Sequence, residues 1–234
     1  TNSPTTVEFN GGSQTIPSTT FDNIPITNGN VKTASNNLII TGEFTIDNAT
    51  TFNEGNNSIT IKKSIINSGT YTGTGTIQIQ NIVTLSGTGN FNFNNLTVLD
   101  NSDSLVANNI AFSVTGSYTN FGTLVTSSTT TFNGNGNQNI IANSFHNVVF
   151  NGGGIKSLNN ATGTFFTGNV TINAVTVAGS VFDYTVKGNW LNTGIFTSGG
   201  TVFFQSDQAQ SVSGGQFIPI IISVYNIYFK FMSN

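Results

Sequence analysis

Few side chains in this sequence are suited to acid–base or metal chemistry. The 234-residue chain has one histidine, His146, and neither cysteine nor arginine. Only two carboxylates lie close together in sequence, in Asp100-Asn-Ser-Asp103, where Ca²⁺ could find several oxygen ligands. A solvated turn is the preferred interpretation of that stretch. The other carboxylates are scattered, at Glu8, Asp22, Glu43, Asp47, Glu54, Asp183 and Asp207.

The enzymes that cleave polysaccharides need more than these residues offer. Glycosidases hold a pair of carboxylates at a defined separation. Polysaccharide lyases use calcium-binding acids and a basic residue that takes a proton from the sugar. The scattered acids nominate neither set, and His146 has no evident partner as a general base. We therefore expect a non-enzymatic chain without catalytic residues, bound cofactor or metal ligands.

The composition narrows the range of partners. Only 6 % of the residues are charged and the net charge is −3, with six lysines as the only basic residues. Because nucleic acid requires a basic face, we expect no nucleic-acid partner. No stretch reaches the roughly 18 apolar residues of a membrane span, so we expect none.

One module, which ends its first half in Asn-x-Gly, occurs three times. Lys187–Gln205 and Lys62–Gln80 align without a gap, and a third copy begins at Thr115. Internal repetition of this kind is typical of a stacked architecture. The copies share an asparagine, a glycine and an apolar position, which are Asn67, Asn120 and Asn192, then Gly69, Gly122 and Gly194, then Ile65, Tyr118 and Trp190.

These shared positions favour structural roles. A buried asparagine at a turn can satisfy its amide by hydrogen bonding along a stack. An exposed aromatic ring at the third position would suit a sugar-binding platform. The interchange of Trp190 with Tyr118 and Ile65 instead indicates a core position that tolerates changes of size.

A longer repeat contains the module. The segment from Phe21 to Gln80 aligns with that from Phe145 to Gln205, and Val31-Lys32 matches Ile155-Lys156. Aromatic landmarks recur beside the copies, at Phe21, Phe93, Phe145 and Phe217. His146 follows one landmark at a position where the residue type varies, which places it on an outer face.

The pattern within the repeats predicts the fold. Short runs such as Ser58–Ile61 and Thr76–Ile79 alternate polar and β-branched residues, as half-buried strands do. Gly- and Asn-rich turns separate them, and no window carries a helical apolar stripe. We predict an all-β chain that forms an elongated, right-handed parallel β-solenoid (β-helix) from internal repeats, with coils of roughly 17 to 25 residues. A run of small β-sandwiches is the alternative.

The repeat also resembles a family. Gly188–Phe196, Thr201–Phe204, Phe93–Val98 and a glutamine, Gln138 or Gln210, resemble the repetitive secreted surface proteins of Bacteroidetes. The resemblance implies a large, adhesin-like solenoid protein outside the cell. Asp103-Ser104-Leu105 likewise resembles their O-glycosylation sequon, with Ser104 as acceptor. Asn-x-Ser/Thr sequons, most of them attributable to composition, occur at Asn48, Asn56, Asn95, Asn160 and Asn169.

We expect residues 1–216 to form the repeat array and residues 217–234 to form an apolar C-terminal strand. That strand would cap the last coil or contact another subunit and build a head-to-tail homopolymer. The expected function is a structural or adhesive one, as a cell-surface stalk or filament subunit, with surface polysaccharide as a further candidate partner. The alternative is a carbohydrate-binding or carbohydrate-cleaving β-helix; an ice-binding solenoid would need a regular array of threonines.

Overall fold

The computed structural model describes residues 5–214, 216–218 and 222–225. These residues form two compact units. Unit 1 comprises the residues up to Phe112 together with Asn120–Val125, and unit 2 comprises Ser113–Thr119 and the residues from Thr126 onward. Among the described residues the regular elements are all strands, with no helix.

In unit 1 the strands form parallel sheets. The first has the order β1-β4-β7-β10, with β1 (Gln14–Ile16), β4 (Asn30–Ala34), β7 (Thr50–Asn53) and β10 (Thr70–Thr72). The second runs β2-β5-β8-β11-β14, with β2 (Thr20–Phe21), β5 (Leu38–Ile40), β8 (Ser58–Ile61), β11 (Thr76–Ile79) and β14 (Asn95–Val98). The third runs β18-β15-β12-β9-β6-β3, with β3 (Ile24–Ile26), β6 (Glu43–Ile46), β9 (Ser64–Asn67), β12 (Ile82–Ser86), β15 (Ser104–Val106) and β18 (Thr123–Val125). A parallel bridge between Thr70 and Asn90 leads from β10 to β13 (Phe91–Phe93).

Unit 2 is built in the same way. One sheet contains β17 (Tyr118–Asn120), β20 (Gln138–Ile141), β23 (Ile155–Leu158), β26 (Thr176–Ala178), β29 (Ile195–Thr197) and β32 (Gln216–Ile218) in that order. A second contains β16 (Phe112–Val114), β19 (Thr129–Phe132), β22 (Asn147–Phe150), β25 (Val170–Ile172), β28 (Trp190–Asn192) and β31 (Val212–Ser213). The third contains β21 (Ser144–Phe145), β24 (Thr164–Phe166), β27 (Tyr184–Val186), β30 (Val202–Gln205) and β33 (Ile222–Tyr225).

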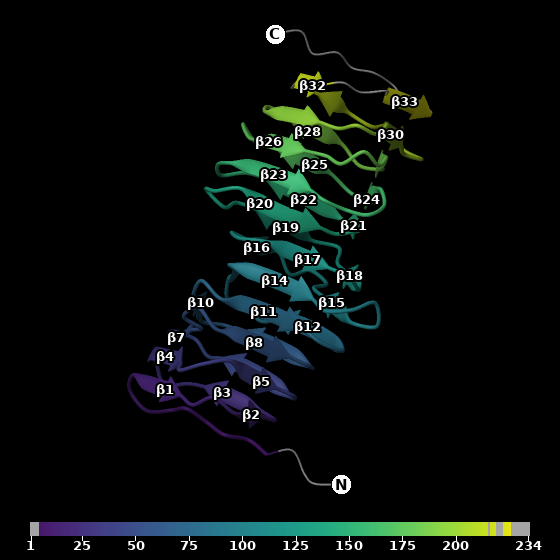
Figure 1. Cartoon of the computed structure of the whole chain (residues 1–234). Helices are drawn as coiled ribbons and strands as arrows, with labels where there is room; N and C mark the ends of the chain where they lie inside the picture. Colours follow the sequence, from purple (N-terminus) through teal and green to yellow (C-terminus); the bar gives the residue numbers. More distant parts are fainter. Residues whose placement is uncertain (1–4, 215, 219–221, 226–234) are drawn as a thin grey trace. The chain divides into compact units, whose positions relative to one another are not determined.

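The chain visits three sheets in turn and then returns to the first, one coil further on (Figure 1). Paired residues lie 18 to 22 positions apart in sequence, as Gln14 with Lys32 and Val83 with Leu105 show. The predicted parallel β-solenoid and its coil length are confirmed, whereas right-handedness stays a prediction. A sandwich is excluded, because its sheets would contain antiparallel pairs.

The core fills the inside of each coil. Along β11, for example, Ile77 and Ile79 are buried while Thr76 and Gln78 are half-buried, which is the period of two that a pleated strand imposes. Aromatic rings pack against each other inside unit 1. Phe52 lies edge-on to Phe44 of the preceding strand and tilted against Tyr71 of the next coil, with ring centroids 4.8 and 5.5 Å away. Burial of such side chains stabilises each coil against its neighbours by about 1.5–3 kcal/mol per residue.

The long repeat is present strand by strand. From β1 to β11 each strand of unit 1 matches one strand of unit 2 from β20 to β30. The pairings match too, since β2-β5-β8-β11 corresponds to β21-β24-β27-β30. The short module, however, falls on three different sheets, with its asparagines at the ends of β9, β17 and β28. The module therefore consists of one strand and the corner that follows it, and it can occupy any of the three sides of the coil.

The structure describes only part of the predicted C-terminal strand. Gln216–Ile218 and Ile222–Tyr225 continue the stack, because β32 pairs with β29 and β33 pairs with β30. The rest of the predicted apolar strand, residues 219–221 and 226–234, lies outside the described residues, and so does any cap or subunit contact made there.

The packing of aromatic rings in the core of unit 2 leads to a first prediction. Phe132 on β19 is buried against Phe145 and Phe150, with ring centroids 5.6 and 5.7 Å away. Phe132→Ala should lower the free energy of unfolding by about 3–5 kcal/mol, because the lost ring leaves a cavity. The neighbouring outward Thr131→Ala should change it by less than about 0.5 kcal/mol. Urea denaturation followed by circular dichroism measures both, and equal midpoints for the two variants would contradict the inward assignment.

Candidate functional site

The Asn-x-Gly corners use their asparagines to hold the chain. Asn67, Asn120 and Asn192 are buried. Each side-chain Oδ1 accepts a hydrogen bond from the backbone N–H of the glycine two residues later, at 3.1, 3.0 and 2.9 Å. Asn67 Nδ2 also donates to the carbonyl of Asn90 in the next coil, at 2.8 Å. The amide oxygens therefore satisfy glycine N–H groups at the corner, and at Asn67 the amide nitrogen bonds along the stack to the next coil.

The glycines of these corners are required by close approach. A Cβ on Gly69 would lie 2.3 Å from the carbonyl oxygen of Thr50, and one on Gly122 would lie 2.2 Å from that of Asp103. Gly194 meets the carbonyl oxygen of Val175 at 2.1 Å. No side chain fits at such distances. In the motif, the asparagine amide closes the turn, and the glycine allows the backbones of adjacent coils to approach each other closely.

The third shared position lies in the core. Ile65, Tyr118 and Trp190 are all buried, and Trp190 packs edge-on against Phe196 and Phe204. The core interpretation is confirmed. None of the three can serve as a sugar-binding platform, because their rings or methyl groups are closed off from solvent.

Two buried lysines were missed as special positions, although the long repeat aligned them. Lys32 Nζ donates to the carbonyl oxygens of Gly11, Gly12 and Gly29 at 2.8–2.9 Å. Lys156 Nζ donates to those of Gly134 and Gly153 at 2.6 and 2.8 Å. Both side chains are fully buried, and burial lowers the pKa of the Lys156 ammonium.

A glutamine one coil earlier completes each lysine site. Gln14 pairs in register with Lys32, and Gln138 with Lys156. Gln14 Oε1 accepts from the Gly11 N–H at 2.8 Å, and Gln138 Oε1 accepts from the Gly134 N–H at 3.0 Å. The same glycine thus gives its N–H to the glutamine and its carbonyl to the lysine. These polar groups tie a glycine-rich turn to the coil beside it.

Glu54 is a buried acid of unit 1. Glu54 Oε1 accepts from the Gly75 N–H at 3.0 Å, and the Tyr71 hydroxyl donates to Oε2. Burial raises the pKa of Glu54 to about 7, against the opposing effect of these two hydrogen bonds. Burial and the neighbouring carboxylate also raise the pKa of Tyr71. The sequence showed Glu54 only as one scattered acid among others.

The Asp100-Asn-Ser-Asp103 stretch forms a turn tied together by its own carboxylates. Asp103 is buried, and its two oxygens accept from the backbone N–H groups of Asn81 and Asp100 at 2.5 and 3.1 Å. Asp100 accepts from the Ser102 hydroxyl and N–H, which lowers the pKa of the Asp100 carboxyl. In the described part of the chain, no three His, Cys, Asp or Glu side chains come close enough to hold a metal ion.

The sequons differ in access. Asn48, Asn56 and Asn169 are exposed, and Ser104 and Asn95 are half-buried. Asn160 is buried, and its Nδ2 donates to the Ala142 carbonyl and the Thr164 hydroxyl. Because a glycan would be attached to that same nitrogen, Asn160 is excluded as an acceptor.

The outer faces offer shallow grooves. One of about 320 Å³ in unit 1 has Glu43 and Lys63 in its wall, and one of about 400 Å³ in unit 2 is lined by glycine, threonine and apolar residues together with Gln216. Neither groove holds two carboxylates. Threonines form outward columns on β1-β4-β7-β10, such as Thr15 beside Thr33, but Asn53 interrupts the column before Thr72.

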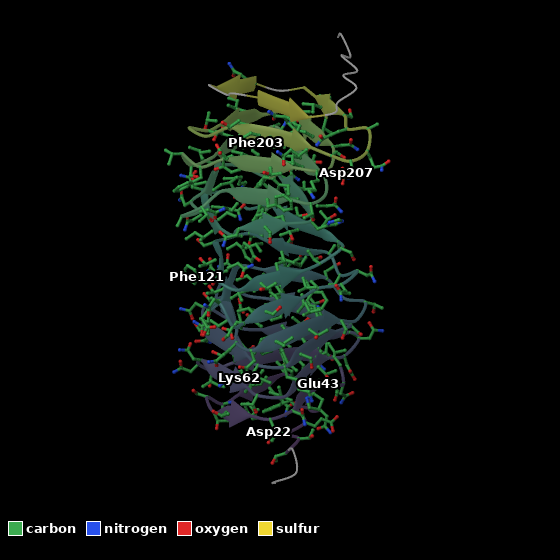
Figure 2. All side chains as sticks on the ribbon, turned by 90° about the vertical axis from the view of Figure 1, so that its right-hand side faces the viewer. Asp22, Glu43, Lys62, Phe121, Phe203 and Asp207 are labelled. Atoms are coloured by element: carbon green, nitrogen blue, oxygen red, sulfur yellow. The ribbon has the colours of Figure 1, made fainter. Side chains whose placement is uncertain are left out.

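His146 lies half-buried after β21, with Nδ1 2.9 Å from the Thr167 hydroxyl oxygen. It belongs to the outer side of the sheet β21-β24-β27-β30-β33, where Phe203 also lies (Figure 2). On the outer side of that sheet, aromatic, imidazole, ammonium and amide side chains follow each other in neighbouring coils, at Phe165, His146, Lys187 and Gln205.

No family model matches this chain, and no curated protein or solved structure was found to be similar to it. The class of protein therefore follows from geometry alone: a parallel β-solenoid with buried polar corners. The resemblance to secreted surface proteins stays a prediction. In the described residues no helix could cross a membrane.

A corner variant tests the role of the asparagines. Asn67→Leu keeps the branched shape at Cγ but leaves the Gly69 N–H and the Asn90 carbonyl without their partner. The free energy of unfolding should fall by about 1–3 kcal/mol. Ser68→Ala, in the same corner, is the control and should leave it nearly unchanged. If both variants unfold at the same urea concentration, the corner bonds do not stabilise the coil.

The buried acid predicts a pH dependence. Because its pKa is raised to about 7, the folded chain holds a proton that the unfolded chain releases near the ordinary glutamate value of 4.5. This contribution to stability is complete below pH 4.5 and is lost as the pH rises through about 7, by up to about 3 kcal/mol. Glu54→Gln should flatten the profile of unfolding free energy against pH, whereas Glu43→Gln should keep its slope. An unchanged slope in Glu54→Gln would assign the effect to another group.

Proposed function

We propose that this chain is a non-enzymatic structural and adhesive β-solenoid that acts outside the cell, as part of a surface stalk or filament. The proposal rests on what its polar side chains do. A protein of this class works by presenting a stable, regular surface and not by turning over a substrate.

One observation carries the proposal: the buried lysines, the buried Glu54 and several buried amides are bonded to backbone groups of the coils. Lys32 and Lys156 hold glycine carbonyls, and Glu54 holds the Gly75 N–H. Asn67 and Gln138 hold corner N–H groups. Groups engaged in this way stabilise adjacent coils and lie where a substrate does not reach them.

The outer faces support the same proposal. Outward positions carry mainly Thr, Ser and Asn, and 6 % of all residues are charged. Such a surface is hydrated but nearly neutral, which suits repeated contact with neutral partners at varying ionic strength, because salt screens only charged contacts. Secretion to the cell surface fits this composition and the resemblance described above.

A carbohydrate-cleaving function is the less supported alternative. Hydrolysis of a glycosidic bond takes two carboxylates on either side of it. In the groove of unit 1 Glu43 is the single acid among the lining residues, and the groove of unit 2 has none. A carbohydrate-binding function needs no such pair and is compatible with an adhesive role.

An activity screen tests the non-enzymatic part. Incubation with neutral and acidic polysaccharides should release neither reducing ends nor unsaturated sugars, and an antibody should label intact producing cells. Turnover that persists through purification and disappears in one acid variant, such as Glu43→Gln, would overturn the proposal. Absence of label on intact cells together with label after lysis would overturn the surface location.

A further inference from the structure

The sheet β21-β24-β27-β30-β33 has an unusual outward column. Its register places Ser144, Phe165, Thr185 and Phe203 side by side in successive coils. Phe165 lies between the buried residues Thr164 and Phe166, so its ring is directed outward, and Phe203 lies between buried Val202 and Phe204 in the same way. Both rings are half-buried on a surface whose other outward residues are polar.

A polar column runs beside the aromatic one. His146 and Thr167 are joined by the contact of 2.9 Å between Nδ1 and the hydroxyl oxygen. Lys187 follows β27, and its Nζ lies over the Phe165 ring, 5.3 Å from the ring centre. Gln205 ends β30. Lys187 and Gln205 are exposed. Hydrogen-bonding groups therefore flank the rings through four successive coils.

Unit 1 provides an internal comparison. Its sheet β2-β5-β8-β11 repeats this sheet strand for strand, and its outward column is Thr20, Ile39, Thr60 and Gln78. Ile39 stands where unit 2 has Phe165, and Gln78 stands where it has Phe203. The polar column is retained as Asp22, Thr41, Lys62 and Gln80, with the hydroxyl of Thr41 2.7 Å from Asp22.

The comparison shows that the two rings are not needed for the fold. The same coils close in unit 1 with isoleucine and glutamine at these positions. Outward phenylalanine costs solubility, since its ring remains partly in water. Two of them in one column, and in one copy of the repeat only, point to a ligand for the rings.

The spacing indicates which ligand. One strand separates Phe165 from Phe203, so their positions are about 9.5 Å apart, twice the distance between neighbouring strands. This is close to the length of a disaccharide in an extended β-linked glycan. The apolar C–H face of a pyranose ring stacks on an aromatic ring, and its hydroxyls at the rim bond to flanking polar side chains.

We propose that this face of unit 2 binds an extended, neutral polysaccharide. Phe165 and Phe203 stack on every second sugar, while Thr185 lies under the sugar between them. The Lys187 side chain moves off the face of the Phe165 ring when the sugar stacks there, and Lys187, Gln205 and His146 bond to the hydroxyls along one edge. The proposal specifies the partner of the adhesive function proposed above and rests on that function.

Affinity electrophoresis tests it with the full chain. The probes are hydroxyethyl cellulose and xylan as neutral glycans and alginate as an acidic one, each cast into a native gel. At least one of the two neutral glycans should retard the protein, and added salt should not abolish the retardation. The double variant Phe165→Ile/Phe203→Gln carries the residues of unit 1 and should weaken binding about tenfold or more.

Leu191→Ala is the matched control. Leu191 is an outward apolar residue of β28, 45 % exposed, in a neighbouring sheet of the same unit. It should bind like the wild type, and all variants should retain the same β-rich circular dichroism.

Several results would overturn the proposal. These are no retardation by either neutral glycan, equal retardation of the double variant, or binding to alginate alone that salt abolishes. Self-association that the double variant loses would instead make the face a contact between copies of the chain. Because the screen for released sugars is separate, failure of this binding leaves the non-enzymatic proposal to be decided on its own.

Discussion

Backbone groups at the corners of the coil impose the constraint on which this structure depends. Parallel pairing satisfies the N–H and C=O groups of the strands, but at each corner the chain changes sheet and the ladder is interrupted. Groups left there inside the stack cost about 1–3 kcal/mol each when unpaired. Three buried side chains meet this requirement in different ways. A polar atom of Asn67, Gln138 or Lys156 forms a hydrogen bond to a backbone N–H or carbonyl group at a corner.

The constraint also explains how ionisable groups come to be buried in a chain with so few of them. A lysine normally remains in water, because transfer of its charge into the interior is expensive. Around Lys32 three carbonyl oxygens at 2.8–2.9 Å replace that water, and the turn they belong to is fixed in return. Glu54 receives fewer donors for its charge, so burial dominates and its pKa rises to about 7. At Glu54 burial thus outweighs the two hydrogen bonds that the carboxylate accepts.

Much of the fold could be predicted because it depends on local sequence patterns and on the internal repeat. Alternation along Thr76–Ile79 gave the strands, and the alignment of Phe21–Gln80 with Phe145–Gln205 gave the stack, which the strand pairings confirm. The side of the coil on which each strand falls could not be predicted, because Asn67 and Asn192 occupy the same position of the module yet end strands of different sheets. The lysine sites were hidden for a similar reason. Gln14 and Lys32 meet only through registry between coils, and neither residue type signals burial by itself.

The inward and outward positions of the coil meet different requirements, and this difference bears on function. Inward positions of the repeat must fill the same core and hold the same turns, and Phe52 and Val177 or Tyr71 and Phe196 accordingly remain apolar or aromatic in both copies. Outward positions carry no such requirement, so that Ile39 and Gln78 in one copy can stand where Phe165 and Phe203 stand in the other without altering a pairing. A repeated scaffold can therefore acquire a binding face by two substitutions, and the copy that lacks them retains the scaffold alone. It follows that the function of such a solenoid is to be sought where its copies differ outside, since what they share inside is explained by the coil.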